Sequence, residues 1–409
     1  MRVWLVEVGE SLPIDEGGRL MRTGLLAKQL TRQGHEATWW ADAFSHLRKS
    51  YRTAQNATVA AGPGLTLELL HAPPYAGNIS LARLRNQRIV AEQFRALAPT
   101  RPRPDVIYCG YPTIELAAET IRYARARGIP VLLDIRDPWP QLFVDLLPRV
   151  LRWFGWIALH KYSQMGRAAV RGATVLCSTC EEFLQWGLEF AQRPRSAQDE
   201  VFYLGYEEPE GQPLEAAGPE RGPELALQCL YVGGFGPAYD LSTVIAAARL
   251  LHRAGRTSVR FVIAGDGAAA PALKRLAQGL PSVHFAGWVS SGQIRYLLSK
   301  SDVGLVAVSG LASTSVPNKS FEYMSGGLLL LNSTTGDLRQ LIEGERIGCN
   351  YPNGDARQLA ARIQNLLQRP EEVREMKQRS RALFLERFEA GKVYGAMADK
   401  LTALAAKGF

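Results

Sequence analysis

The chain alternates short apolar runs with amphipathic helical patterns, and it does so in two separate series. The apolar runs of the first series lie at 2–8, 35–41, 105–110, 131–136 and 174–179. Those of the second series lie at 229–234, 260–267, 283–289, 302–308 and 328–332. Regular alternation of strands and helices is typical of doubly wound domains with a parallel sheet. The sequence therefore predicts an α/β protein with two such domains.

A segment without apolar periodicity separates the two series. Residues 207–223 are rich in Glu, Pro, Gly and Ala, which is typical of a linker. The length of 409 residues also favours two domains, because single cores seldom grow beyond about 250–300 residues. We expect an N-terminal domain at 1–206, a linker at 207–226 and a C-terminal domain at 227–388. The helix expected at 389–409 is predicted to pack back against the N-terminal domain.

The cysteine content and the N-terminal sequence indicate the cellular compartment in which the protein is expected. Five cysteines are an odd and sparse set, which favours a reducing environment. Cys177 and Cys180 form a C-x-x-C, but a strand pattern precedes them and no second Cys or His pair lies near, so core cysteines are predicted and no metal site. The N-terminus lacks a signal peptide pattern, and no window reaches the ~20 apolar residues that span a bilayer. We therefore expect a cytoplasmic protein.

The segment VPNKSFEYMSGG at 316–327 places Lys319 and Glu322 one helical turn apart, after a proline and before two glycines. A helix that begins at Pro317 leaves backbone amides free, and these amides and the helix dipole favour a bound phosphate. Lys319 adds a positive charge, and the Glu322 oxygens can accept hydrogen bonds from two sugar hydroxyls. The segment therefore predicts a site for a nucleoside diphosphate. The alternative is a solvated surface ion pair, which the flanking apolar runs disfavour because they place the helix N-terminus at the ligand-binding edge of a parallel sheet.

Two glycine turns follow strands of the second domain, GGFG at 233–236 and GDG at 265–267. Glycine lets the backbone approach a ligand closely. Neither turn is a full dinucleotide fingerprint, and ordinary turns between a strand and a helix also use glycine. Each turn alone is therefore a weak indication of a binding site.

Three ionisable residues, Asp134, Arg136 and Asp137, lie together at the end of a strand of the first domain. Either aspartate could orient an acceptor hydroxyl, and Arg136 could hold a phosphate or a sugar hydroxyl. An arginine flanked by two carboxylates could equally form a structural set of salt bridges. The sequence leaves both interpretations open.

The segment 146–180 contains no Asp or Glu, although it is rich in basic and aromatic residues. Basic groups bind anionic headgroups and aromatic rings favour the membrane interface. The residues predicted to contact an anionic membrane surface are Arg149, Arg152, Trp153, Trp156 and Lys161. One alternative is a core helix with basic ends, since Val150, Phe154 and Ile157 follow core spacing. Nucleic acid is not an expected partner, because no nucleic-acid motif accompanies the charge.

Five motifs follow one another from 230 to 327: LYVGGFG, FVIAGDG, VHFAGWVS, SDVGLVAV and PNKSFEYMSGG. In these motifs, and more loosely in LAKQLTRQGHEATWW and IPVLLDIRDPWP of the first half, the chain resembles family 4 of the retaining glycosyltransferases. The resemblance covers nearly the whole chain. It implies the GT-B fold, in which two Rossmann-like domains face each other across a cleft. It also implies a UDP-sugar donor, retention, and no metal or other cofactor, because a lysine and helix dipoles neutralise the leaving diphosphate.

The resemblance also implies roles for individual residues. Glu322 would bind the ribose, Lys319 and nearby amides the diphosphate, and the turn at 287–289 the base. The donor-binding residues expected on this basis are Gly17, Gly18, Gly233, Gly234, Phe235, Gly265, Asp266, Gly267, Trp288, Val289, Thr314, Ser315, Asn318, Lys319 and Glu322. The chain departs from the family at Thr314, where many members have a glutamate that contacts the donor sugar. It also has Gly234-Phe235 in place of a common arginine, and Arg136-Asp137 where His-Asp is often seen.

The variant motif P-x-K-x-x-E-Y-M is similar to that of members that build bacterial capsule, exopolysaccharide or O-antigen. This similarity implies a hexosyltransferase-type enzyme that moves a sugar, such as an N-acetylated hexosamine or a deoxyhexosamine, to a lipid-linked or glycan acceptor. With the basic aromatic segment, it implies peripheral attachment to the inner face of the cell membrane. The alternatives are a sugar-nucleotide epimerase on the same fold, which the few histidines disfavour, and an inactive membrane-bound scaffold, which Thr314 favours.

Overall fold

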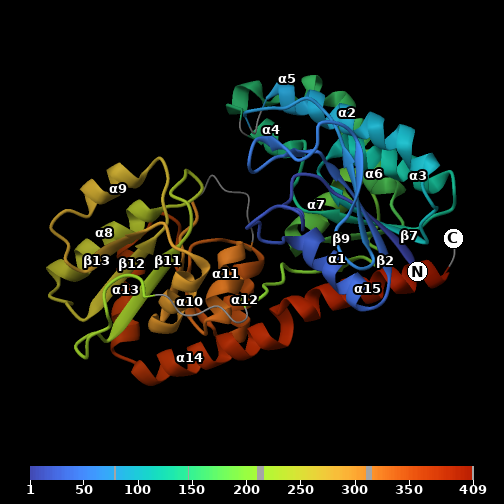
Figure 1. The fold of residues 1–409 in the computed structure, drawn as a ribbon. Coiled ribbons are helices and arrows are strands. Elements are labelled where there is room, and N and C mark those ends of the chain that lie inside the picture. The colour runs from blue at the N-terminus through green and yellow to red at the C-terminus, as the bar shows by residue number, and fades with distance from the viewer. Residues whose placement is uncertain (78–79, 146, 210–215, 310–315, 408–409) are drawn as a thin grey trace. The chain divides into compact units, whose positions relative to one another are not determined.

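The structure is a computed structural model, and it describes residues 1–409 except 78–79, 146, 210–215, 310–315 and 408–409. The chain forms two compact units. The first unit consists of Met1–Tyr203 together with Ala390–Phe409, and the second of Leu204–Glu389. Each unit contains a mainly parallel sheet covered by helices (Figure 1), which confirms the predicted α/β class.

The sheet of the first unit has eight strands in the order β10-β9-β8-β7-β1-β2-β6-β5. These strands are β1 (Arg2–Val6), β2 (Glu36–Asp42), β5 (Ala57–Ala60), β6 (Leu65–Leu70), β7 (Val106–Tyr111), β8 (Val131–Ile135), β9 (Val175–Ser178) and β10 (Glu200–Val201). Neighbouring strands are parallel except β5 and β6. The five predicted runs form the centre of the sheet. The sequence does not predict β5, β6 and β10, nor the small hairpin of β3 (Phe44–Ser45) and β4 (Ser50–Tyr51).

Helices cover both faces of this sheet. They are α1 (Arg22–Arg32), α2 (Leu81–Leu97), α3 (Ile114–Arg125), α4 (Gln141–Asp145), α5 (Arg152–Ala158), α6 (His160–Gly172), α7 (Glu181–Ala191) and α15 (Ala390–Lys407), with 3₁₀ turns η1 (Ala98–Thr100) and η2 (Arg149–Leu151). Leu26 of α1 and Met397 of α15 share one buried cluster with the strand residues Val3 and Leu5. Figure 1 accordingly shows α15 beside α1.

The opposite face of the first sheet carries a cluster of aromatic rings. Side chains alternate along a strand, so Trp4 of β1 points away from Val3 and Leu5. Its ring centre lies 5.0 Å from that of Trp40 and 5.2 Å from that of Tyr123 of α3. Such large rings bury much apolar surface, so they anchor helices to the sheet.

The second unit has a six-stranded sheet in the order β13-β12-β11-β14-β15-β16, with parallel neighbours throughout. Its strands are β11 (Leu227–Val232), β12 (Val259–Ala264), β13 (Val283–Gly287), β14 (Val303–Val306), β15 (Leu329–Asn332) and β16 (Gly348–Asn350). Its helices are α8 (Leu241–Arg253), α9 (Ala270–Leu276), α10 (Ser291–Lys300), α11 (Asn318–Ser325), α12 (Asp337–Glu345), α13 (Ala356–Leu367) and α14 (Pro370–Leu383), followed by the π-helical turn η3 (Phe384–Phe388). The five predicted strands are confirmed, and only the edge strand β16 is additional.

The segment expected to be a linker falls within the second unit, apart from residues 210–215, which lie outside the described residues. Arg221 forms an ion pair with Asp302 at 2.8 Å. Arg260 of β12 donates a hydrogen bond to the backbone oxygen of Glu220 at 2.7 Å. The segment is therefore tied to the sheet by side chains far along the chain, which a local composition does not reveal.

The two glycine turns at the carboxyl ends of β11 and β12 pack backbone against backbone. The amide of Phe235 donates a hydrogen bond to the backbone oxygen of Asp266 at 2.9 Å. A Cβ on Gly265 would lie 1.9 Å from the backbone oxygen of Gly233, and Gly265 also has a φ of +131°. Residues with a side chain rarely adopt that φ. Close packing of the two turns thus accounts for the glycine.

The change Gly265→Ala should lower the free energy of unfolding by about 2–4 kcal/mol, because the new Cβ must displace the Gly233 turn and strain the backbone. Urea unfolding followed by far-ultraviolet circular dichroism measures the change. Gly344→Ala is the control, since Gly344 lies in α12 with no atom within 4 Å of a Cβ and no positive φ. The control should leave stability unchanged or raise it by up to ~1 kcal/mol. Equal midpoints for the two variants would contradict this account.

Candidate functional site

The helix α11 lies between β14 and β15 and begins directly after Pro317, as the sequence predicts. Its buried face holds Phe321, Tyr323 and Met324 against the sheet. The hydroxyl of Tyr323 accepts a hydrogen bond from the amide of Val232 at 2.9 Å, at the end of β11. This contact fixes the first turns of α11 next to the glycine turn that follows β11.

Lys319 is buried, with only 7 % of its surface exposed. Its Nζ lies 3.8 Å from the ring centre of Tyr231 and 3.7 Å from that of Tyr239, so two aromatic faces stabilise the charge. A Cβ on Gly233 would lie 3.0 Å from Nζ, so the glycine makes room for the ammonium group. No described residue accepts a hydrogen bond from Nζ. An anionic ligand would supply the acceptor that this buried ammonium group lacks among the described residues.

Burial also changes the ionisation of this lysine. Desolvation lowers the pKa of Lys319 to about 7, and the nearby Glu322 carboxylate opposes the shift. The side chain is therefore only partly charged at neutral pH. An anion bound beside Nζ would restore the charge by raising that pKa.

Glu322 lies on the same helix and is half-buried. Its Oε1 accepts a hydrogen bond from the hydroxyl of Tyr206 at 3.1 Å. A cavity of about 300 Å³ is lined by Ala238, Tyr239, Val308, Pro317, Asn318, Lys319 and Glu322. The structure therefore brings the predicted Asn318, Lys319 and Glu322 together at one cavity.

The other predicted donor residues are distributed as follows. Gly234 is exposed, and its backbone oxygen accepts a hydrogen bond from the Tyr231 hydroxyl at 2.8 Å. Phe235 is only 2 % exposed and belongs to the hydrophobic core, so its side chain packs inward. Trp288 is 84 % exposed in the turn after β13, whereas Val289 is buried.

The remaining predicted donor residues that the structure describes do not line the cavity beside Lys319 and Glu322. Asp266 is exposed, and its carboxylate accepts a hydrogen bond from the Gly267 amide at 2.8 Å. Gly17, with a φ of +64°, and Gly18 lie in the loop after β1 in the first unit. Thr314 and Ser315 lie outside the described residues.

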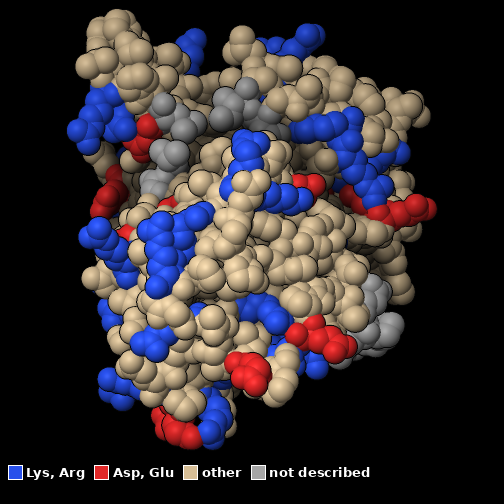
Figure 2. Space-filling view, turned by 90° about the vertical axis from the view of Figure 1, so that its left-hand side faces the viewer, with Lys and Arg blue, Asp and Glu red and all other residues tan. Residues whose placement is uncertain are grey.

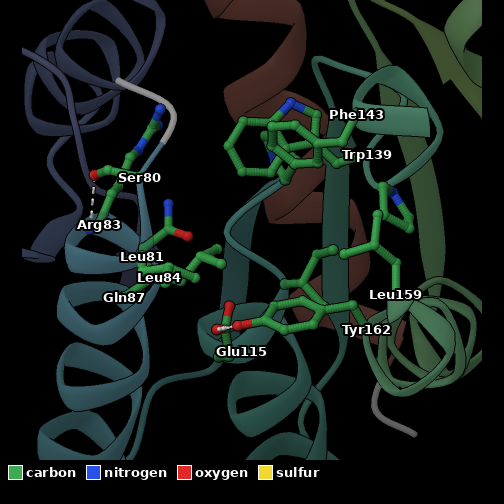
Figure 3. Close-up of a pocket in the computed structure, with 13 residues that line it drawn as sticks. Ser80, Leu81, Arg83, Leu84, Gln87, Glu115, Trp139, Phe143, Leu159 and Tyr162 are labelled. Carbon is green, nitrogen blue, oxygen red and sulfur yellow. Dashed lines mark hydrogen bonds between the residues drawn. The ribbon is translucent and has the colours of Figure 1, made fainter. Parts of the chain in front are cut away.

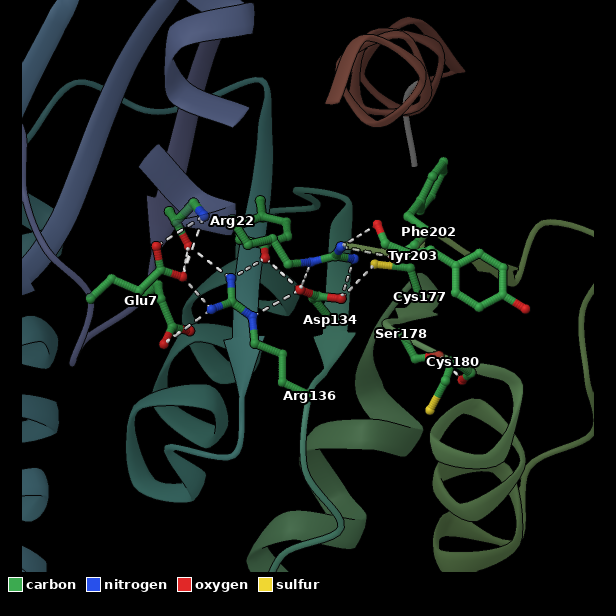
Figure 4. A network of polar contacts seen from close by, with 12 residues as sticks. Glu7, Arg22, Asp134, Arg136, Cys177, Ser178, Cys180, Phe202 and Tyr203 are labelled. Carbon is green, nitrogen blue, oxygen red and sulfur yellow. Dashed lines mark hydrogen bonds and ion pairs between the residues drawn. The ribbon is translucent and has the colours of Figure 1, made fainter. Parts of the chain in front are cut away.

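In the first unit, Asp134 is completely buried at the centre of a network of charges (Figure 4). Arg22 binds both of its oxygens, with Nε 2.7 Å from Oδ2 and Nη2 2.9 Å from Oδ1. Arg136 Nε and the Tyr108 hydroxyl also donate to Oδ2, at 3.0 and 2.5 Å. These donors hold the pKa of Asp134 well below its usual range, despite its burial.

The remaining contacts of Arg136 complete this network. Its Nη1 forms an ion pair with Glu10 and lies 3.7 Å from Glu7. Burial raises the pKa of Glu7 to about 8, so that carboxyl is mostly protonated at neutral pH. Two arginines then face the two carboxylates of Asp134 and Glu10. The structure thus supports the salt-bridge interpretation for Asp134 and Arg136, and Asp134 has no surface with which to touch an acceptor.

Two family models match the chain. Residues 17–198 match the model described as a glycosyl transferase 4-like domain, and residues 226–369 match the model described as glycosyl transferases group 1. Together they cover most of both units. The chain belongs to the GT-B glycosyltransferases.

Solved structures share the fold of this glycosyltransferase over nearly the whole chain. Sucrose-phosphate synthase from Thermosynechococcus elongatus has a TM-score of 0.70 at 14 % identity, with 100 % of both chains covered. HepE from Anabaena in complex with UDP has a TM-score of 0.65 at 15 % identity, covering 98 % of this chain and 99 % of that one. WaaG, a glycosyltransferase involved in lipopolysaccharide biosynthesis, has a TM-score of 0.63 at 13 % identity, with 98 and 99 % covered. The comparison with curated proteins gave no match.

Asp137 differs from its buried neighbour Asp134. It is half-buried in the loop after β8, and burial raises its pKa to about 6, against the effect of Arg136 and Arg83. It follows the carboxyl end of a central strand, where parallel sheets bind ligands. Asp137 is therefore more accessible to a ligand than Asp134, and its role at an acceptor hydroxyl stays a prediction.

The cysteines of the glycosyltransferase agree with the core interpretation. Cys177 and Cys180 are both buried, and the Cys177 Sγ lies 3.4 Å from Asp134 Oδ1 (Figure 4). Among the described residues, no three or more His, Cys, Asp or Glu side chains are grouped so that they could hold a metal ion.

Sequence reasoning missed three tyrosines that contact Lys319 or Glu322, namely Tyr206, Tyr231 and Tyr239. They lie in three separate segments: before β11, within it and after its glycine turn. No spacing links them in the sequence. Only the closeness of Tyr231 and Tyr239 to the GGFG turn is a local signal.

Replacement of Asp134 by asparagine should lower the free energy of unfolding by about 3–5 kcal/mol, because Arg22 and Arg136 would lose their shared buried carboxylate. Thermal and urea unfolding measure the loss. Glu371→Gln is the matched control, since Glu371 is paired with Arg374 at the surface, where both side chains are mostly exposed. That control should barely move the midpoint. A similar midpoint for both variants would show that the network does not stabilise the fold.

Proposed function

We propose that this glycosyltransferase transfers a sugar from a nucleoside diphosphate sugar, with UDP as the nucleotide, to a lipid-linked or glycan acceptor. The observation that carries the proposal is the buried ammonium group of Lys319, which lacks a hydrogen-bond acceptor among the described residues. A diphosphate supplies such acceptors and the missing negative charge. Glycosyltransferases of the same fold have been solved with UDP and with UDP-glucose, HepE among them.

The proposed donor pose follows from the groups around the cavity. The diphosphate lies between Lys319 Nζ and the amides at the start of α11 and in the Gly233–Gly234 turn, where the helix dipole favours negative charge. The Glu322 carboxylate accepts hydrogen bonds from the ribose hydroxyls, and the Tyr206 hydroxyl holds it in place. The exposed ring of Trp288 offers a face for the base.

The chemical step needs little beyond these groups. Developing charge on the leaving diphosphate is stabilised most by preorganised donors, so Lys319 and the amides would lower the barrier without a metal ion. Transfer then proceeds with retention, and the departing phosphate accepts the proton of the acceptor hydroxyl. Asp137 is proposed to orient that hydroxyl by accepting its hydrogen bond.

The proposed acceptor class is lipid-linked and the proposed pathway is cell-surface polysaccharide synthesis, with a hexosamine or deoxyhexosamine as the sugar. The helix α5 supports a membrane contact. Its only buried residue is Gly155, while Trp153, Phe154 and Ile157 are 56, 53 and 65 % exposed. Val150 before it is 77 % exposed, so the core-helix interpretation is wrong.

Charge on the protein surface fits the same proposal. The exposed residues Arg149 and Lys161 lie on either side of α5, and the half-buried Arg152 begins it. Within the described ranges, none of the helices combines the length and apolarity needed to cross a bilayer. On the face drawn in Figure 2, Lys and Arg side chains form several separate groups. Attachment at the inner face of the membrane would therefore run through the apolar rings and basic groups of α5.

Lys319→Met should weaken the binding of UDP-glucose about 10–100-fold, since hydrogen bonds to charged groups contribute about 1.5–3 kcal/mol. Affinity in the wild-type protein should fall as the pH rises above about 7, because the ammonium form of Lys319 predominates below that pKa and is lost above it. The fall should approach about tenfold per pH unit. Isothermal titration calorimetry between pH 6 and pH 9 measures both effects.

The controls for this experiment are in the same unit. Lys274→Met removes an exposed lysine of α9 and should bind UDP-glucose as the wild type does. Lys319→Met should bind weakly at every pH without the fall above pH 7. Because methionine replaces a buried charge that lacks a hydrogen-bond acceptor among the described residues, the unfolding midpoint of this variant should not drop. An unchanged midpoint shows that weaker binding is not caused by unfolding.

Unchanged affinity of Lys319→Met for UDP-glucose would reject the donor site. Release of UDP from a UDP-sugar would distinguish a transferase from an inactive scaffold.

The double change Trp153→Ser/Phe154→Ser should reduce binding to vesicles that contain anionic lipids at least about tenfold, since each ring contributes about 1.5–3 kcal/mol when fully buried. Flotation of the protein with vesicles of phosphatidylglycerol and phosphatidylethanolamine measures the binding. Leu276→Ser, at a half-exposed position of α9, is the control. If both variants float as the wild type does, α5 does not contact the membrane.

A further inference from the structure

A cavity of about 330 Å³ lies in the first unit, among side chains of α2, α3, α4 and α6. Figure 3 shows Leu84 of α2 on one side and Leu159 and Tyr162 on the other, with Trp139 and Phe143 at one end. The volume lies within the range of sites that bind small molecules, about 300–1,000 Å³. The cavity therefore has room for part of a ligand.

Two of the polar side chains at this cavity, Tyr162 and Glu115, are hydrogen-bonded to each other. The hydroxyl of Tyr162 donates a hydrogen bond to Glu115 Oε1 at 2.6 Å, so Tyr162 presents its ring carbons to the cavity. Glu115 is only 6 % exposed, and burial raises its pKa. The guanidinium group of Arg83 lies 5.2 Å from the ring centre of Trp139. Most of the other lining side chains are apolar, so the wall offers a sugar few hydrogen-bond partners and suits a hydrocarbon chain better.

The segments that flank α5 in the sequence line this cavity, and α5 itself has an exposed apolar surface. Phe143 belongs to α4, and Leu159 joins α5 to α6, so both neighbours of α5 supply the cavity wall. On the other side of the cavity, Leu81 at the start of α2 is 84 % exposed. The first half of α2 also carries Arg83, Arg85 and Arg88, of which Arg83 lines the cavity and Arg88 forms an ion pair with Glu92 at 3.5 Å. Apolar walls beside Arg83 match an amphiphile with a hydrocarbon chain and an anionic headgroup.

We propose that this cavity binds the hydrocarbon chain of the acceptor lipid, and that Arg83 of α2 holds its phosphate. The proposal rests on the proposed function, because it takes the acceptor to be lipid-linked. It adds a defined place for one chain, as opposed to the bulk membrane lipid that α5 would contact. The phosphate end would then lie near the loop that holds Asp137, since Trp139 of the same loop lines the cavity.

Isothermal titration with hexyl, octyl and decyl phosphate, each below its critical micelle concentration, tests the proposal. Affinity should rise about fourfold for each added methylene until the chain fills the cavity, because a buried methylene contributes about 0.8 kcal/mol. Leu84→Trp fills the cavity and should weaken decyl phosphate at least tenfold. Leu276→Trp, at the surface of α9, is the matched control and should have no effect.

Other results of these titrations distinguish binding in the cavity from surface attraction and from misfolding. Equal affinity for the three phosphates, or binding unchanged in Leu84→Trp, overturns the proposal and leaves only surface attraction to the arginines. Leu84→Phe fills less space and should give an intermediate loss, which a misfolded chain would not. Lys319→Met should bind decyl phosphate normally while it loses UDP-glucose. These measurements therefore distinguish an error in the proposed lipid cavity from an error in the proposed donor site.

Discussion

The buried ammonium group of Lys319 is the constraint around which the candidate donor site is organised. Removing a charge from water is costly, and among the described residues two aromatic faces and a nearby carboxylate compensate for it. Tyr231 also holds the backbone of the glycine turn through Gly234, so the residue that stabilises the charge shapes the surface beside it. Gly233 leaves room for the ammonium group, because a Cβ there would lie 3.0 Å from Lys319 Nζ.

The buried charged residues of the two units differ in their hydrogen bonding. In the first unit, Asp134 is enclosed by donors from Arg22, Arg136 and Tyr108, which leaves no hydrogen-bonding capacity for a ligand. In the second unit, Lys319 has no hydrogen-bond acceptor within the described part of the chain. Full pairing stabilises a fold, whereas an unsatisfied charge stores binding energy for a ligand. This contrast separates a structural network from a binding site more clearly than sequence spacing does.

The sequence predicts the central strands and the helix that carries Lys319 and Glu322, because these features depend on local periodicity and on the proline and glycines around one helix. The sequence does not predict features that depend on contacts between residues far apart in the chain. Arg22 and Asp134 are 112 positions apart, and neither sits in a pattern that points to the other. The residues Val150, Phe154 and Ile157 show core spacing although they are exposed, since an apolar stripe has the same period whether its partner is protein or membrane.

The helix α15 belongs to the first unit, although the whole second unit precedes it in the chain. It fills the same cluster as α1, and Gln33 just after α1 donates a hydrogen bond to Asp399 at 3.0 Å. A ribosome releases the N-terminal strands long before it releases this helix. The face of the first sheet that α15 covers therefore stays exposed to water throughout synthesis of the second unit. The last helix acts as a closing step in folding, and the nascent first unit depends on chaperones or on its own solubility until that step is complete.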